Sequence, residues 1–250
     1  MNYTRRSFAS RLGWLSVGVL GGKAVAGLPA SGAGQEPDHS HLPMTTHAWG
    51  SAENKLAAAD ELWANLEAGN QRFVAGQPAP RELVARREEL ATGQHPQVAV
   101  LTCSDSRVDP ALIFDQNLGH LFVVRTAGNV ADAVALGSLE YAVSHLPVRL
   151  LVILGHEKCG AVARAVSGEK MPTPNLAAII DKIAPAVAKV RGKAEGEALL
   201  RAAEEANVRQ VASDILASSP IVLHEVAAQN LEIIKAIYNL KTGQVNRLTA

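Results

Sequence analysis

Two short segments hold the residues of this chain that are best suited to bind a transition metal. Residues 103–107 read Cys-Ser-Asp-Ser-Arg, and residues 156–160 read His-Glu-Lys-Cys-Gly. They contain the only two cysteines of the 250 residues. Thiolate sulfur and imidazole nitrogen are preferred zinc ligands, and a His-x-x-Cys spacing lets one segment supply two corners of a tetrahedral site. We therefore expect a zinc site in which the first segment supplies the remaining ligands.

Each of these segments follows a continuous apolar run. Residues 98–102 read Val-Ala-Val-Leu-Thr, residues 150–154 read Leu-Leu-Val-Ile-Leu, and a third run at 121–125 reads Leu-Phe-Val-Val-Arg. Such runs are typical of strands in a parallel sheet that is covered by helices on both faces. Because binding sites in these sheets form beyond the carboxyl ends of the strands, both segments should meet at one edge. The sequence predicts an α/β domain with a mostly parallel central sheet flanked by helices.

The rest of the chain predicts helices around that sheet. An amphipathic helix is expected to begin at residues 60–66, and residues 175–217 are Ala-rich and favour helix. Gly192 and Gly196 predict a break within this second stretch, and Pro185 predicts a helix start or a kink. The tail at 231–248 is compatible with a helix or a strand, followed by a turn at 241–243 and a last edge strand.

The two metal-binding motifs, in this order and spacing, resemble the signature of the β-class carbonic anhydrases. The similarity extends from about Ala58 to Leu248 and includes Gly-Asn-Gln-Arg-Phe at 69–73, Phe-Val-Val-Arg-Thr-Ala-Gly-Asn at 122–129 and Gly-Ser-Leu-Glu-Tyr-Ala-Val at 137–143. The resemblance implies a zinc lyase that catalyses the reversible hydration of CO2 to bicarbonate and a proton, through a zinc-bound hydroxide. It also implies a homodimer or tetramer, because the family's pocket is completed across a two-fold interface.

The resemblance assigns roles residue by residue. Cys103, His156 and Cys159 match the three permanent ligands of one zinc ion per chain, and Asp105 matches a carboxylate that either binds zinc or pairs with Arg107. The positions implied for substrate binding are Gln94 for bicarbonate or the transition state, Phe122, Ala127 and Tyr141 for an apolar CO2 pocket, and Gly160 as the small residue beside the last ligand.

Elementary electrostatics supports a catalytic role for Asp105 and Arg107. Two thiolates neutralise the zinc dication, so a third anion from Asp105 would close the site, whereas catalysis needs an open fourth position. Arg107 is able to take the carboxylate in a bidentate, charge-assisted pair and hold it off the metal. The pair is therefore expected to gate the fourth zinc position.

Three other functions use the same residues. A purely structural zinc is one, although such zinc is typical of small cysteine-rich domains rather than of a chain with a large core. Hydrolysis of carbonyl sulfide or carbon disulfide on the same site is another. A non-catalytic zinc-binding or storage protein is the third, and the Asp105–Arg107 pair argues against it because storage needs no open position.

The amino terminus has the layout of an export signal. Residues 4–9 read Thr-Arg-Arg-Ser-Phe-Ala, an apolar stretch covers 12–20, and Ala-Val-Ala stands at 24–26. This pattern predicts twin-arginine export to the periplasm or the medium, with the export machinery as a partner. The alternative is a disordered basic leader. The stretch is shorter than the about 20 apolar residues that span a bilayer, so no stable membrane anchor is expected.

The organisation that we expect is an export signal at 1–26, a flexible linker at 27–54 and a single catalytic domain at 55–250. Hydrophobic residues make up 48% of the chain, which is enough for a full core. The formal charge is zero, and a mature chain that starts at Gly27 would hold 20 basic and 24 acidic residues. This balance is too acidic for a nucleic-acid-binding protein, so no nucleic acid partner is expected.

Overall fold

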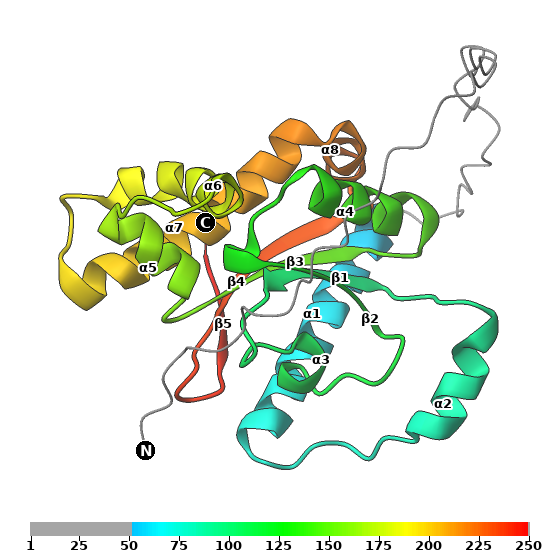
Figure 1. The fold of residues 1–250 in the computed structure, drawn as a ribbon. Helices are drawn as coiled ribbons and strands as arrows, with labels where there is room; N and C mark the ends of the chain where they lie inside the picture. Colours follow the sequence, from blue (N-terminus) through cyan, green and yellow to red (C-terminus); the bar gives the residue numbers. More distant parts are fainter. Residues whose placement is uncertain (1–51, 250) are drawn as a thin grey trace, which may run out of the picture. The chain divides into compact units, whose positions relative to one another are not determined.

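The apolar runs form one five-stranded sheet in the computed structural model, which describes residues 52–249 (Figure 1). The strands are β1 (Val98–Cys103), β2 (Leu121–Thr126), β3 (Leu150–His156), β4 (Glu232–Tyr238) and β5 (Val245–Arg247). Their order is β2-β1-β3-β4-β5, and only the pairing of β5 with β4 is antiparallel. The prediction of a mostly parallel α/β sheet is confirmed.

The register of the central strands aligns the ends that carry the metal-binding segments. Every residue of β1 and β3 is buried, as their continuous apolar sequences predict. Cys103 pairs with Thr126 of β2, and Thr102 pairs with Leu154 of β3. The Thr102 hydroxyl also donates to the Leu154 carbonyl oxygen at 2.8 Å, which satisfies a polar side chain inside the sheet.

Helices cover both faces of the sheet. Their bounds are α1 (Ala52–Val74), α2 (Leu83–Glu89), α3 (Pro110–Ile113), α4 (Ala133–His145), α5 (Gly160–Ser167), α6 (Pro174–Val190), α7 (Gly196–Ser218) and α8 (Pro220–Ala227), with short 3-10 turns η2 (Leu90–Thr92) and η3 (Ala127–Asn129). α1 and α3 pack on one face through Trp63, Leu66 and Ile113. α4, α7 and α8 pack on the other through residues such as Leu139 and Ile215 (Figure 1).

A third apolar cluster lies at the carboxyl end of the sheet. It combines Cys103 and Cys159 with side chains of α5, α6 and α7, among them Val162, Ile183 and Ala203. The two cysteines therefore stand in a dry environment that is built by helices from the second half of the chain. Such surroundings strengthen the electrostatic interactions of any ion that binds there.

The helix boundaries refine the sequence-based expectations. α1 begins at Ala52, inside the segment expected to be linker, whereas the expected signal and the rest of the linker lie outside the described residues. Pro185 lies inside α6 and starts no helix, and the expected break falls between α6 and α7. The tail forms strand β4, the turn and strand β5. Among the described helices, none has both the length and the apolarity needed to cross a bilayer.

Asp115, in the connection between α3 and β2, binds the last turn of α1 and the segment that follows it. Its buried carboxylate accepts hydrogen bonds from Arg72 Nε at 2.6 Å, from Arg81 Nη2 at 2.9 Å and from the Ala79 backbone N–H at 2.9 Å. Burial by itself would raise the pKa of Asp115, but these hydrogen bonds outweigh it and hold the pKa below its ordinary value.

We expect Asp115→Asn to lower the free energy of unfolding at pH 7 by about 2 kcal/mol, because it weakens these charge-assisted hydrogen bonds. A folded-state pKa below the unfolded value contributes stability that is present above about pH 4 and is lost as the pH falls through the folded pKa. The difference between wild type and variant should therefore shrink on acidification.

Urea unfolding at pH 7 and at acidic pH, with the zinc concentration held constant, measures this difference. Glu89→Gln is the control, since it breaks only the exposed ion pair with Arg86 and should change stability by less than about 0.5 kcal/mol. A difference between wild type and Asp115→Asn that stays constant over the pH range would contradict the assignment.

Candidate metal centre

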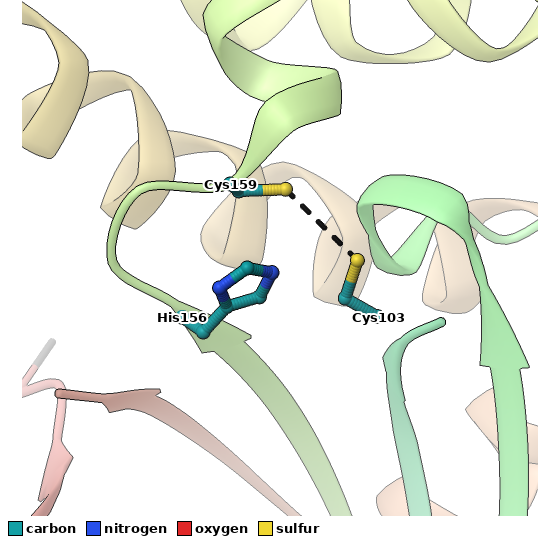
Figure 2. A group of neighbouring side chains, drawn as sticks. All are labelled: Cys103, His156 and Cys159. Atoms are coloured by element: carbon teal, nitrogen blue, oxygen red, sulfur yellow. Dashed lines mark hydrogen bonds between the residues drawn. The ribbon is translucent and has the colours of Figure 1, made fainter. Parts of the chain in front are cut away.

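Three side chains converge at the carboxyl end of the sheet. Cys103 is the last residue of β1, His156 is the last residue of β3, and Cys159 immediately precedes α5. All three are buried, and their possible ligand atoms lie within 4.8 Å of one another. Figure 2 shows the two sulfur atoms and the imidazole ring pointing toward one another. The structure thus brings together the three residues that the motifs predict as permanent ligands.

The geometry of this cluster fits a zinc ion. The two sulfur atoms lie 4.0 Å apart, close to the roughly 3.8 Å between two thiolates that bind one zinc tetrahedrally at about 2.3 Å. His156 Nδ1 lies 2.9 Å from the Glu157 carbonyl oxygen, which leaves Nε2 as the ligand atom. This buried Nε2 has no hydrogen-bond partner among residues 52–249, as expected of a nitrogen atom that serves as a metal ligand.

Mutual contacts also set the proton affinities of the cluster. The hydrogen bond from Cys159 is the main cause that lowers the pKa of Cys103, and the N–H of Gly128 acts in the same direction. The same contact, together with burial, raises the pKa of the Cys159 thiol. Burial opposes the charged form of His156, but the nearby Cys103 thiolate outweighs it and raises the pKa of His156. Cys103 is therefore the thiol that ionises first.

Asp105 and Arg107 form a bidentate pair beside the three ligands. Arg107 Nε donates to Asp105 Oδ1 at 2.9 Å, and Nη2 donates to Oδ2 at 2.7 Å. Oδ2 lies 3.9 Å from His156 Nε2, so the oxygen that Arg107 holds is also the one that faces the cluster. The hydrogen bonds from Arg107 hold the pKa of Asp105 well below its usual range, which keeps the carboxylate ionised.

Two of the expected pocket residues lie beside the cluster. Ala127 follows β2 and precedes Gly128, whose backbone N–H lies 3.2 Å from Cys103 Sγ. Gly160 directly follows Cys159 and is the first residue of α5. A Cβ at Gly160 would meet no other segment within 4 Å among the residues that the structure describes, so their packing does not require glycine there.

Three other expected pocket residues lie away from the cluster of their own chain. Phe122 pairs with Ala99 near the amino end of β2, roughly 13 Å along the strand from Thr126. Its ring packs on Tyr141 of α4 at a centroid distance of 6.3 Å. Gln94 is exposed and precedes the amino end of β1, whereas Cys103 ends that strand. Within one chain, these side chains do not line the site.

Comparison with known proteins identifies the family. The carbonic anhydrase family profile matches residues 98–245. Carbonic anhydrase 2 of Mycobacterium tuberculosis is 39% identical over 186 residues, which cover 73% of this chain and 89% of that relative. The β-carbonic anhydrase CafA of Aspergillus fumigatus has a TM-score of 0.62 and 26% identity, covering 78% of this chain and 89% of the other. The chain belongs to the β-class carbonic anhydrase family.

Family membership makes this chain a carbonic anhydrase, and the Cys103–His156–Cys159 cluster agrees with the zinc that β-carbonic anhydrases use. A β-carbonic anhydrase of Sordaria macrospora, one of two described as tetrameric, shares the fold with a TM-score of 0.61. At 23% identity, covering 79% of this chain and 97% of the other, this last likeness concerns the fold alone.

The structure of this carbonic anhydrase gives supporting roles to residues for which the motifs assigned none. Arg125 donates to the backbone oxygens of Cys103 at 3.1 Å and Asp105 at 2.6 Å, so it supports the first ligand segment. Glu204 and Asn207 of α7 are buried polar residues that contact the backbone beside the cluster. Burial raises the pKa of Glu204 to about 7, against the opposing effect of its hydrogen bond from Cys159. The only sign of these contacts in the sequence was that Glu204 and Asn207 lie on an otherwise apolar stripe of the helix.

Proposed function

We propose that this carbonic anhydrase holds one zinc ion through Cys103, His156 and Cys159 and catalyses the reversible hydration of CO2. The convergence within 4.8 Å of two thiols and one imidazole nitrogen, which has no hydrogen-bond partner in the described part of the chain, supports this function best. When bound there, zinc supplies the Lewis acidity that makes water a nucleophile near neutral pH. The protein contributes the dry surroundings and the position of each ligand.

Asp105 and Arg107 act as a gate in this proposal. Arg107 holds the Asp105 carboxylate in a bidentate pair, so this carboxylate would not compete with water for a zinc ion held by Cys103, His156 and Cys159. Asp105 Oδ2 lies 3.9 Å from His156 Nε2, so with zinc bound the carboxylate would be able to accept a hydrogen bond from that water and orient it. If Arg107 releases it, the same oxygen becomes able to bind the metal.

A CO2-hydration assay on the purified chain tests the proposal, with carbonyl sulfide and carbon disulfide as parallel substrates. We expect hydration that rises in proportion to zinc content, up to one zinc per chain, and disappears when zinc is removed. Turnover of carbonyl sulfide without CO2 hydration would assign the site to the other substrate. A zinc-loaded chain that turns over none of the three would contradict a catalytic function.

We further propose that a second copy of the chain completes the substrate pocket. Phe122, Tyr141 and Gln94 lie away from their own cluster, and Val123 and Val134 expose apolar surface around the edge strand β2. A homodimer or tetramer would bury this surface and bring the three side chains to a neighbour's zinc site. Light scattering should give a particle mass of two or four chains, and a monomer with full activity would contradict this arrangement.

We also propose that the chain is exported by the twin-arginine route to the periplasm or the medium, on the strength of the Arg5–Arg6 pair in the leader. Export of a folded protein lets zinc bind in the cytoplasm, where Cys103 and Cys159 stay reduced. We expect the double substitution Arg5→Lys, Arg6→Lys to leave the precursor in the cytoplasm on cell fractionation. Unchanged export of the double variant would remove the twin-arginine assignment.

A further inference from the structure

One helix contacts both segments that carry the cysteines. α7 places Glu204 and Asn207 three residues apart, on the stripe that also holds Ala203, Val208 and Val211. Both polar side chains are almost fully buried, with 4% and 1% of their surface exposed. Burying a polar side chain is costly unless it is hydrogen-bonded, and both the Glu204 carboxylate and the Asn207 amide nitrogen have backbone partners beside the metal-binding cluster.

Glu204 holds the loop that ends in Cys159. Its Oε1 accepts the Cys159 backbone N–H at 2.9 Å. The preceding residue, Lys158, has φ +55°, a left-handed conformation that costs a residue with a side chain roughly 1–2 kcal/mol. The loop between His156 and Cys159 is therefore strained, and the contact with Glu204 stabilises the strained form.

Asn207 holds the turn that contacts Cys103. Its Nδ2 donates to the Gly128 carbonyl oxygen at 2.9 Å, and the Gly128 N–H in turn points to Cys103 Sγ at 3.2 Å. Gly128 has φ +70°, and a Cβ there would lie 2.7 Å from Ile183 Cδ1 and 3.0 Å from Ala161 Cβ, so a side chain at this position would be strained. The turn, its N–H and the thiolate are thus positioned as one unit.

Gly155 lets α7 approach these segments closely. A Cβ at Gly155 would lie 2.4 Å from Val208 Cγ2 of α7 and 2.8 Å from Ile237 Cδ1 of β4. The absence of a side chain one residue before His156 brings the helix down onto β3. This approach puts the neighbouring turn of the helix, with Glu204 and Asn207, within hydrogen-bond distance of both cysteine-bearing segments.

We propose that Glu204 and Asn207 are positioning residues that preform the metal centre by locking its two thiolate-bearing segments onto one rigid helix. The proposal rests on the zinc site assigned above. Because the ligands are already in place, metal binding does not have to order the loops. Asn207 has a second effect, since the Gly128 N–H that it orients withdraws electron density from the Cys103 thiolate and limits how strongly it donates to the metal.

The test uses the full-length chain and the variants Glu204→Ala, Glu204→Gln and Asn207→Leu. Zinc release is followed with a chromogenic chelator in excess, and the cobalt-substituted proteins give thiolate-to-metal absorption bands. We expect Glu204→Ala and Asn207→Leu to release zinc about 10–100 times faster than wild type. Glu204→Gln should be intermediate, because its amide oxygen still accepts the Cys159 N–H.

The cobalt spectrum distinguishes positioning from general stability. Asn207→Leu frees the turn that directs the Gly128 N–H to Cys103, so the charge-transfer band should move to longer wavelength. Glu204→Gln, which acts on a backbone group rather than on a sulfur atom, should leave the band near its wild-type position. Glu205→Gln is the matched control, since it removes the same charge one residue along α7 from a half-buried side chain, and it should change neither readout.

Wild-type zinc release and wild-type cobalt spectra in Glu204→Gln and Asn207→Leu would overturn the proposal. Glu204→Gln is mild enough to fold, so it keeps the test informative if the larger changes do not give soluble protein. Failure of the wild-type chain to bind zinc would refute the proposed function instead, and the two failures are therefore distinguishable. Lower thermal stability of the metal-free variants with unchanged zinc release would assign both residues to fold stability alone.

Discussion

Replacing Cys159 with serine is expected to abolish zinc binding and CO2 hydration together. A serine hydroxyl stays protonated at neutral pH and is a poor zinc ligand, so only Cys103 and His156 would remain of the three permanent ligands. Activity should fall to the level of the zinc-free protein. The variant should also unfold more easily than zinc-loaded wild type, because metal binding energy is also folding energy.

Metal analysis after dialysis against a mild chelator, combined with thermal unfolding in the presence and absence of zinc, measures both effects. Ser167→Ala is a suitable control, because the Ser167 hydroxyl is bonded, within residues 52–249, to the Arg164 carbonyl and the Glu169 N–H at the end of α5. It should keep zinc and activity. Stoichiometric zinc in Cys159→Ser after dialysis would contradict the ligand assignment.

Replacing Arg107 with alanine is expected to leave zinc bound while hydration falls on the order of 100-fold, as for loss of one preorganised electrostatic contact. The variant loses both side-chain hydrogen bonds that hold the Asp105 carboxylate, at 2.9 and 2.7 Å. Asp105 Oδ2 already faces His156 Nε2, so the freed carboxylate should take the fourth ligand position and exclude water. Arg107→Ala should therefore keep its zinc and lose activity, whereas Cys159→Ser should lose both.

Two further variants refine this expectation. Arg107→Lys should rescue poorly, because an ammonium group lacks the planar fork that matches a carboxylate. Asp105→Ala should keep an open site, but it lacks the carboxylate that orients water. We expect reduced activity and a flatter pH dependence of that activity. Zinc content and hydration rates from about pH 6 to 9 measure these differences, a range that brackets the pKa near 7 of zinc-activated water.

The pH dependence of wild type provides an internal check. Arg107 keeps the pKa of Asp105 well below its usual range, so this carboxylate stays ionised throughout the measured range and its titration adds no step. Wild-type activity should rise with pH through the neutral to mildly alkaline range as water loses its proton. Near-wild-type hydration by Arg107→Ala would refute the gate and leave Arg107 with a structural role only.

Much of the fold could be predicted from the sequence because its central strands have a clear hydrophobic pattern. The continuous apolar runs at 98–102, 121–125 and 150–154 are compatible with burial on both faces, and each became a parallel strand. Since parallel strands end at a common edge, the approach of Cys103 to His156 could be predicted as well. The sequence of the tail at 231–248 was compatible with a helix or a strand. In the structure its first part pairs with β3 and forms strand β4.

The sequence by itself determined which residues bring metal chemistry to this protein, because ligand type and spacing are local properties of two five-residue segments. Only the tertiary structure decided how these segments are held and which expected pocket residues share a site. Glu204 and Asn207 lie 45 and 79 residues from the groups they bind, so local pattern carries no sign of the contact. Phe122 and Gln94 were expected to bind substrate, and the direction of β2 and β1 places them near the amino ends of those strands, away from the cluster of their own chain. Hydrogen bonds between distant segments depend on helix packing, and packing exists only in the folded chain.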